Sequence, residues 1–258
     1  MTEIIPNLKI VDLALYHTKE DILIIGDTHI GYEEALNKQG LFIPRFQFEE
    51  IGKRLDNILK KTKKLKKIII NGDIKHEFGT ISEQEWRHTL RLLDFLSKYC
   101  KDIILIRGNH DTILGPIAKK RNVKIEDSYI IHERSELGKK KFMKQISSQR
   151  KNNILIIHGH KIPKQIPKET KTIIIGHEHP AISLREGPRV ETYKCFLKGK
   201  WKRYNLIVMP SFNLITEGTD IVKERLLSPF LQQNIESFEA YIIADKIYKF
   251  GKLKNLNF

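Results

Sequence analysis

The sequence predicts an α/β protein in which two packed, mixed β-sheets are flanked by helices. The first observation is that five short apolar runs of isoleucine and leucine recur between residues 21 and 179, with helical periodicity between several of them. The second is that the helical signal fades after residue 120, where alternating apolar and polar residues take over. Uniformly apolar runs are typical of strands covered on both faces, whereas the alternating segments predict antiparallel strands.

The five apolar runs are the expected central strands. They are DILIIGD (21–27), KKIIINGD (66–73), DIILIRGNH (102–110), NILIIHGH (153–160) and TIIIGHEH (172–179). Because helical segments separate the first three, we expect right-handed parallel crossovers between them.

Two of the connections between these strands predict amphipathic helices. In residues 48–62, four apolar side chains fall on one helical face: Ile51, Leu55, Ile58 and Leu59. In residues 82–99, four more do the same: Trp86, Leu90, Leu93 and Leu96. Ser82 and Glu85 have the spacing of a capping box, which predicts that the second helix begins after Ser82.

The later part of the chain carries the alternating pattern in four segments. They are VKIEDSYIIHE (123–133), VETYKCFLKG (190–199), YNLIVMPSF (204–212) and FEAYIIADKIYKF (238–250). The chain has no internal repeat, low-complexity segment or Gly/Ser linker. We therefore expect a single domain over residues 1–258, in which residues 180–258 form a β-rich C-terminal part packed on the same core.

Composition indicates a folded protein, because 40% of the residues are hydrophobic and 30% are charged over 258 positions. No apolar run approaches the roughly 18 residues that a membrane-spanning helix needs. The N-terminus lacks a basic segment followed by an apolar one, so no secretion signal is expected. A cytoplasmic protein without membrane contact is the prediction. Cys100 and Cys195 lie outside any Cys-x-x-Cys pair and are expected to be buried thiols.

The net charge of +15, from 46 Lys and Arg against 31 Asp and Glu, favours anionic partners, and nucleic acid is the commonest of these. Much of the excess lies in two lysine-rich stretches, 53–67 and 138–151. Lysine-rich surfaces also serve solubility, and abundant Lys, Glu and Ile would suit a thermophile. Charge alone therefore leaves the nucleic-acid interpretation open.

Each of the five apolar runs ends in side chains that can bind metals. These are Asp27 and His29; Asp73 and His76; Asn109, His110 and Asp111; His158 and His160; and His177 and His179. Seven of the ten histidines lie at these ends, whereas histidines that serve packing would be scattered, as His17, His88 and His132 are. Ligands of open α/β sheets bind beyond the carboxyl ends of the strands, so we expect one shared site.

The ligand types indicate which metals this site suits. Imidazole, carboxylate and amide groups without thiolate suit Mn²⁺, Fe²⁺ or Zn²⁺. About seven such ligands exceed what one ion needs from protein, which favours two ions that share a bridging carboxylate. Glycine precedes the polar group at four of the strand ends, namely at Gly26, Gly72, Gly108 and Gly176. It lets the chain leave the strand sharply.

The motifs GDTH, NGDIKH, GNHD, HGH and GHEH occur in this order, and with them residues 21–180 resemble the calcineurin-like metallophosphoesterases. Residues 179–190 and 209–221 also look like the archaeal phosphoesterases related to the SbcD nuclease. The resemblance implies an αββα sandwich and two divalent ions, of which manganese is the first choice and iron or zinc the alternatives. It also implies hydrolysis of a phosphoester by a metal-activated hydroxide.

The resemblance further implies a role for each ligand. One ion would be held by Asp27, His29 and His179, the other by Asn109, His158 and His177, and Asp73 would bridge them.

The HGH motif leaves open whether His158 or His160 is the ligand. His158 is preferred because it directly follows the strand, which leaves His160 to face the substrate or support a ligand. His110 would contact the scissile phosphate or protonate the leaving oxygen, with Asp111 orienting it.

Other candidate residues have competing interpretations. His76 matches a histidine near the leaving group in the nuclease branch, and we prefer this role to that of a solvent-facing helix start. Arg45 either pairs with phosphate or is a surface arginine at the start of a helix. Glu178 could support an imidazole, but a solvent-facing side chain is the preferred interpretation. Residues 211–220 either edge the substrate groove or form a turn.

The leading functional hypothesis is a metal-dependent phosphodiesterase, either a nuclease or a repair-associated enzyme acting on DNA or RNA, with DNA-repair proteins as candidate partners. The alternative is a phosphatase or phosphodiesterase for a small nucleotide or another phosphorylated metabolite. A noncatalytic scaffold of the same fold belongs to a different class. It is disfavoured because degenerate members of such families lose ligands, whereas this chain keeps the full set, including His110.

Overall fold

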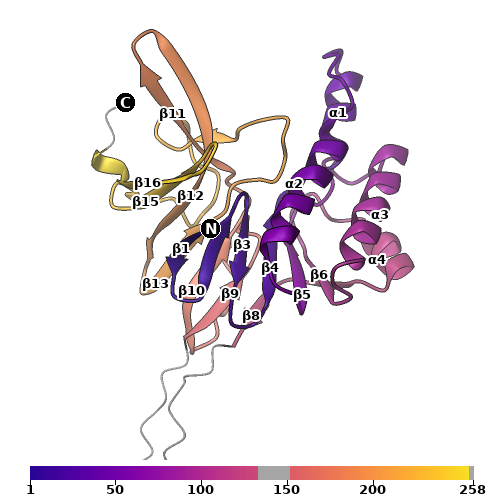
Figure 1. Cartoon of the computed structure of the whole chain (residues 1–258), viewed down its shortest axis with the longest axis horizontal. Helices are drawn as coiled ribbons and strands as arrows, with labels where there is room; N and C mark the ends of the chain where they lie inside the picture. The colour runs from indigo at the N-terminus through magenta and orange to yellow at the C-terminus, as the bar shows by residue number, and fades with distance from the viewer. Residues whose placement is uncertain (133–151, 256–258) are drawn as a thin grey trace, which may run out of the picture.

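The computed structural model describes residues 1–132 and 152–255, except for the side chain of Glu186. Within them the chain forms two β-sheets flanked by four α-helices (Figure 1). The predicted α/β fold with two packed, mixed sheets is confirmed. The second lysine-rich stretch, 138–151, lies outside the described residues.

The first sheet contains the three strands predicted at the start of the chain. Its seven strands follow chain order: β1 (Thr2–Ile5), β2 (Leu8–Val11), β3 (Ala14–His17), β4 (Ile22–Gly26), β5 (Lys67–Asn71), β6 (Ile103–Ile106) and β7 (Lys124–Glu126). Strands β4 to β7 run parallel, as the predicted crossovers require, and β1 to β4 form antiparallel pairs.

The second sheet contains the other two predicted central strands, β9 and β10, which run parallel. Its strands are β8 (Tyr129–Ile131), β9 (Asn153–Ile156), β10 (Thr170–Ile175), β11 (Pro180–Glu186), β12 (Arg189–Trp201), β13 (Tyr204–Val208), β14 (Thr219–Asp220), β15 (Glu239–Ile243) and β16 (Ile247–Lys252). Their order is β14-β11-β12-β13-β10-β9-β8, and β15 joins β12 to β16. The C-terminal part thus extends the sheet that β9 and β10 begin.

The helices lie together on the side of the molecule where β4, β5 and β6 are found (Figure 1). They are α1 (Tyr32–Lys38), α2 (Gln47–Lys61), α3 (Glu83–Ser97) and α4 (Gly115–Arg121). Both predicted helices are confirmed, since the four apolar residues predicted for α2 are buried and Ser82 and Glu85 form the capping box of α3. After α4, the described part of the chain contains only a short 3-10 helix, η1 (Leu253–Asn255).

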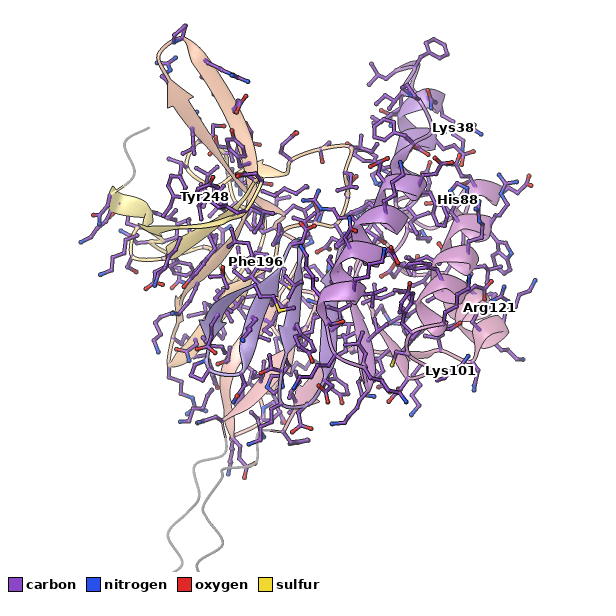
Figure 2. All side chains as sticks on the ribbon, in the orientation of Figure 1. Lys38, His88, Lys101, Arg121, Phe196 and Tyr248 are labelled. Carbon is purple, nitrogen blue, oxygen red and sulfur yellow. The ribbon has the colours of Figure 1, made fainter. Side chains whose placement is uncertain are left out.

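Two apolar cores explain the layering. Ile174 of β10 and Phe196 of β12 belong to the core that also contains the central strands of the first sheet, so the sheets pack face to face. Phe196 lies inside the molecule in Figure 2, while the labelled charged side chains point outward. Ile173 and Ile175 face the opposite way and meet Phe230 in a second core. The outer face of the second sheet is therefore covered by the segment between β14 and β15.

The structure also departs from the sequence predictions at several elements. Strands β1 to β3 and helices α1 and α4 were not predicted. The segment containing β7 was expected to be antiparallel, but β7 pairs with β6 in parallel. Alternation reports that one face of a strand is exposed, which is common in antiparallel sheets but also holds for a parallel strand at the edge of a sheet, such as β7. Cys100 and Cys195 are buried free thiols, as predicted.

The carboxyl ends of the parallel strands of both sheets meet at one rim. The backbone N–H of Phe212, just after β13, donates to the carbonyl of Gly26 at 2.8 Å, and that of Asn213 donates to the carbonyl of Asp27 at 3.1 Å. These bonds join the two sheets where the metal-binding side chains emerge. None of the helices in the described ranges is long and apolar enough to cross a membrane.

Candidate metal centre

The turns at this rim bring together all seven residues predicted as metal ligands. Asp27 and His29 follow β4, Asp73 follows β5, Asn109 follows β6, His158 follows β9, and His177 and His179 follow β10. Two groups of three have ligand atoms within 4.8 Å of one another: Asp27, His29 and His179 in the first group, and Asp73, His158 and His177 in the second. The first group coincides with the residues implied for one ion, and the second combines His158 and His177, implied for the other ion, with Asp73, the implied bridging residue.

Asp73 belongs to the second group and also faces the first. Its Oδ2 atom is 3.9 Å from Nε2 of His29 in the first group and 3.2 Å from Nε2 of His158 in the second. One carboxylate oxygen thus faces imidazoles of both groups, which is the position that a bridging ligand occupies. Asn109 belongs beside the second group, because its Oδ1 lies 3.0 Å from Nε2 of His158.

Asp27 provides a direct test of whether this centre suits a cation. Its side chain is fully buried, and its Oδ1 atom has no hydrogen-bond partner among the described residues. Nitrogen atoms of His158 and His179 lie 3.4 Å from this oxygen, but neither makes a hydrogen bond with it. A buried carboxylate oxygen without a donor is costly unless a cation is bound. The residues present therefore fit divalent metal ions.

The backbone conformation of the ligands supports the same conclusion. Within residues 1–132 and 152–255, ten non-glycine residues have positive φ, and five of them are predicted ligands: Asp27, His29, Asp73, His177 and His179. Positive φ is unfavourable for residues with a Cβ atom, and such strain concentrates at functional sites. The turns are thus held in conformations that aim these side chains inward.

The negative charges of the buried carboxylates favour a positive charge on the neighbouring His158. Burial disfavours an imidazolium at His158, but the carboxylates of Asp27 and Asp73 outweigh it and raise the pKa of His158 to about 9. Against the effect of burial, the hydrogen bond and charge of His158 hold the pKa of Asp73 well below its usual range. Asp73 is therefore ionised at neutral pH, the state in which a carboxylate binds a metal, whereas His158 must release a proton to bind one.

Buried amides that the sequence did not single out hold the first ligand turn. Nε2 of Gln47, the first residue of α2, contacts the carbonyls of Thr28 and His29 at 3.2 Å and Oδ1 of Asn213 at 3.0 Å. Gln47 and Asn213 are both buried. Asn213 lies in the polar run 211–220, which therefore supports a ligand turn at this point.

The GNHD turn is organised by the carboxylate of its own Asp111. Asp111 accepts hydrogen bonds from the backbone N–H groups of Gly108 at 3.0 Å and Ile74 at 3.1 Å. Burial, reinforced by the charge of Asp73, raises the pKa of Asp111 to about 7. The imidazole of His110 is instead tied through Nδ1 to the carbonyl of His76. Asp111 therefore positions His110 through the turn and not by a bond to its ring.

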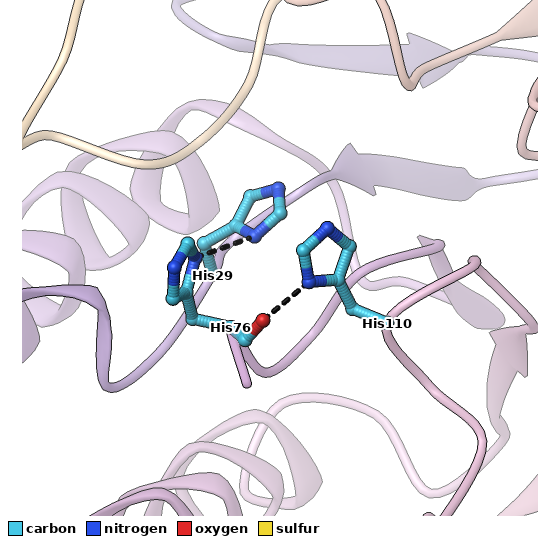
Figure 3. Close-up of side chains that lie close together, drawn as sticks. All are labelled: His29, His76 and His110. Carbon is cyan, nitrogen blue, oxygen red and sulfur yellow. Dashed lines mark hydrogen bonds between the residues drawn. The ribbon is translucent and has the colours of Figure 1, made fainter. Parts of the chain in front are cut away.

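His76 lies in the site beside His29 and His110, as Figure 3 shows. Its Nδ1 is 3.4 Å from Nδ1 of His29, and its ring stacks on Tyr32 with centroids 4.1 Å apart. The three histidines also form a third group whose ligand atoms lie within 4.8 Å of one another. His76 thus faces the centre and not bulk solvent.

The three remaining candidate residues, His160, Arg45 and Glu178, lie in different environments. His160 is half-buried and lies outside the ligand groups, with its ring centroid 5.2 Å from that of His158. Arg45 is exposed on the loop between α1 and α2. The solvent-facing interpretation of Glu178 is wrong, because its carboxylate is buried and accepts hydrogen bonds from the backbone N–H groups of Leu227 and Ser228.

Residues 21–209 match the model of the family described as calcineurin-like phosphoesterase. The chain belongs to this family. Membership supports phosphoester hydrolysis as the reaction and implies divalent metal ions as cofactors. The His and Asp groups of this calcineurin-like phosphoesterase could hold such ions.

Two solved structures resemble this calcineurin-like phosphoesterase. The nuclease MPE of Pseudomonas putida has a TM-score of 0.58 and 20% sequence identity, with 94% of each chain covered. A protein of unknown function from Aquifex aeolicus has a TM-score of 0.36 and 21% identity, covering 61% of this chain and 78% of its own. The first likeness bears on the fold alone, and the second is too weak to carry an argument. No curated protein matches the chain.

Proposed function

We propose that this protein is a two-metal phosphodiesterase that cleaves nucleic acid. The observation that carries the proposal is the position of Asp73, whose single Oδ2 atom faces His29 on one side and His158 on the other. A phosphodiesterase that uses two ions needs such a shared carboxylate to hold them close together.

The predicted ligands divide between the two ions. Asp27, His29 and His179 would hold one ion, Asn109, His158 and His177 the other, and Asp73 would contact both. Manganese is the proposed metal, with iron or zinc as alternatives, because the centre offers imidazole, carboxylate and amide groups without thiolate. Such a pair of ions supplies an activated water and stabilises negative charge on the phosphoryl oxygens.

His110 is the proposed residue for contact with the substrate. Its Nδ1 is engaged by the carbonyl of His76, which leaves Nε2 as the nitrogen that can meet a phosphate or leaving oxygen. The backbone N–H of His110 donates to Oδ1 of Asp73 at 2.9 Å, so the position of this side chain is linked to the bridging carboxylate. A protonated His110 would donate from Nε2 to the leaving oxygen, with His76 beside it.

Nucleic acid is the proposed substrate because of charge. The chain carries a net charge of +15, and polyanions bind such surfaces through many phosphate contacts. The Pseudomonas putida protein is named a nuclease, and it supports this choice only through its similar fold. The second candidate, hydrolysis of a small nucleotide or phosphorylated metabolite, uses the same centre and is separated from the first by experiment.

The test measures metal content and hydrolysis together. Purified protein with Mn²⁺ is expected to hold about two ions per chain and to hydrolyse bis(p-nitrophenyl) phosphate and single-stranded DNA or RNA. Asp73→Asn is expected to lose both the metal and the activity. Asp102→Asn, at the opposite end of the first sheet, is the matched control. A fully active Asp73→Asn enzyme would falsify the two-metal centre, and activity confined to monoesters would favour the second candidate.

A further inference from the structure

A cavity of about 140 Å³ lies beside the second ligand group, where the edges of the two sheets meet. One wall comes from the end of β6 and the turn after β7, and the other comes from the turn after β9. The polar lining residues are Arg107, Asp127, Ser128, His158, His160 and Lys161. The cavity therefore shares one side chain, His158, with the proposed metal centre.

Arg107 is the main cationic group of this cavity. It immediately precedes Gly108 of the GNHD turn, and its backbone N–H donates to the carbonyl of Glu126 at 2.9 Å, which fixes its place at the rim. Its Nε lies 3.4 Å from Oδ1 of Asp127, and the two side chains are 45% and 80% exposed. A long contact between exposed partners is weak. Most of the guanidinium fork is thus available for an oxyanion.

The opposite wall adds two further nitrogen groups. Nδ1 of His160 is buried without a hydrogen-bond partner in the parts of the chain that the structure describes. Lys161 is exposed, and the segment after it carries the exposed Lys164 and Lys168. A buried polar atom without a partner is unfavourable, so a ligand that supplied a partner to the imidazole of His160 would be stabilised by it.

We propose that this cavity binds the phosphate next to the scissile one in a nucleic-acid strand, with Arg107 as its principal contact and Lys161 and His160 on the other side. The inference rests on the proposed function, in which the scissile phosphate lies at the metal centre. Because His158 belongs to that centre and also lines the cavity, the cavity is adjacent to the scissile phosphate. It adds a binding site, and Arg107 as a specificity-determining residue, to the ligands described above.

The lining favours a phosphate over a nucleobase. Arginine, lysine and histidine residues are among those that line the cavity, and no Phe, Tyr or Trp is among the described lining residues. Bases are held chiefly by stacking on such rings, whereas phosphates are held by arginine and lysine. The exposed Lys164 and Lys168 extend the positive charge beyond the cavity, where further phosphates of a bound strand could contact it.

The proposal predicts opposite effects on strand binding for mutations of Asp127 and of Arg107. Its carboxylate pairs with Arg107 and would compete with a bound phosphate for the guanidinium. Removing this carboxylate should therefore strengthen strand binding, whereas removing Arg107 should weaken it. A purely structural role of the ion pair would give both changes the same sign.

The experiment measures binding of a fluorescein-labelled single-stranded DNA to the full chain at several salt concentrations, with Ca²⁺ present to slow cleavage. Arg107→Gln is expected to weaken binding about ten-fold and to reduce the slope of log Kd against log salt by about one. Lys161→Gln should have a smaller effect, and Asp127→Asn should tighten binding several-fold. Arg203→Gln, which removes an exposed arginine at the far end of β13, is the matched control.

Hydrolysis of bis(p-nitrophenyl) phosphate with Mn²⁺ separates this inference from the proposed function. Wild-type protein without that activity would count against the phosphodiesterase proposal, whatever the binding data show. If the wild type is active but Arg107→Gln binds DNA as Arg203→Gln does, the cavity does not hold a phosphate. A phosphate site in the cavity is equally ruled out if Asp127→Asn and Arg107→Gln both weaken binding.

Discussion

Two glycines beside the metal ligands are required for space and not for backbone conformation. Gly108 and Gly176 do not have positive φ. A Cβ atom on Gly108 would lie 2.0 Å from Oδ1 of Asp73, and one on Gly176 would lie 2.2 Å from Oδ2 of Asp27. Real Cβ atoms do not approach other atoms so closely, so each glycine leaves room for a ligand carboxylate from the neighbouring turn.

Gly176→Ala tests this role at the first ligand group. The added methyl group must displace the Asp27 carboxylate, so we expect metal affinity to fall at least about ten-fold and stability to fall by about 1–3 kcal/mol. Calorimetric titration with Mn²⁺ and denaturant unfolding measure the two effects. Gly52→Ala is the control, because Gly52 lies within α2 with nothing near its Cβ position, and it should stabilise the helix by up to about 1 kcal/mol. Unchanged metal affinity in Gly176→Ala would refute the space argument.

At the scale of elements, the start of helix α3 is also part of the site. Glu85 completes the capping box by accepting from the backbone N–H of Ser82 at 2.7 Å. The same carboxylate accepts from the N–H groups of His76 at 3.0 Å and Glu77 at 2.7 Å. A helix-capping residue therefore also fixes the turn that carries His76 and supplies the carbonyl for His110.

Ser82→Ala and Glu85→Gln separate the two roles of this helix start. Ser82→Ala removes one cap and is expected to cost about 1 kcal/mol of stability with little change in kcat. Glu85→Gln replaces one acceptor oxygen with an amide donor, so it should cost about 1–3 kcal/mol and also lower kcat, with metal content retained. Urea unfolding, metal analysis and hydrolysis of bis(p-nitrophenyl) phosphate provide the readouts. Equal losses of kcat in the two variants would mean that α3 acts through stability alone.

The elements also show what the sequence could predict. The central strands were predictable because each is a continuous apolar run, and helices α2 and α3 because each carries a periodic apolar pattern over 15 residues. Helices α1 and α4 have only seven residues each, too few for a clear helical period. Strands β1 to β3 are four residues long and joined by tight turns, so their pattern resembles an irregular segment.

The buried residues that hold the ligand turns in place were harder to predict than the metal ligands themselves. The ligands share one signal, a polar side chain directly after an apolar strand. Gln47, Asn213 and Glu178 are buried by segments distant in sequence: Gln47 bonds to Asn213, and Glu178 bonds to Leu227 and Ser228. A single sequence does not show which distant backbone groups a polar side chain will meet, so Glu178 was expected to face solvent.

At the scale of the whole molecule, the metal centre is assembled from both sheets. Asp27, His29, Asp73 and Asn109 follow strands of the first sheet, and His158, His177 and His179 follow strands of the second. Bound ions would therefore connect the two layers. Since a ligand that binds only the folded state stabilises it, metal binding should be visible in global unfolding.

Metal removal tests this connection. An ion present at about 100 times its Kd stabilises the folded state by about 2.7 kcal/mol, which corresponds to a rise in Tm on the order of 5–10 °C for a chain of this size. We expect Mn²⁺ to raise Tm by such an amount relative to protein treated with EDTA, as measured by calorimetry. His158→Asn should lose the shift, because His158 lies in the second ligand group. His160→Asn should keep the Tm shift, because His160 lies outside both ligand groups. If His160→Asn instead loses the shift and His158→Asn keeps it, His160 is the metal ligand of the HGH motif.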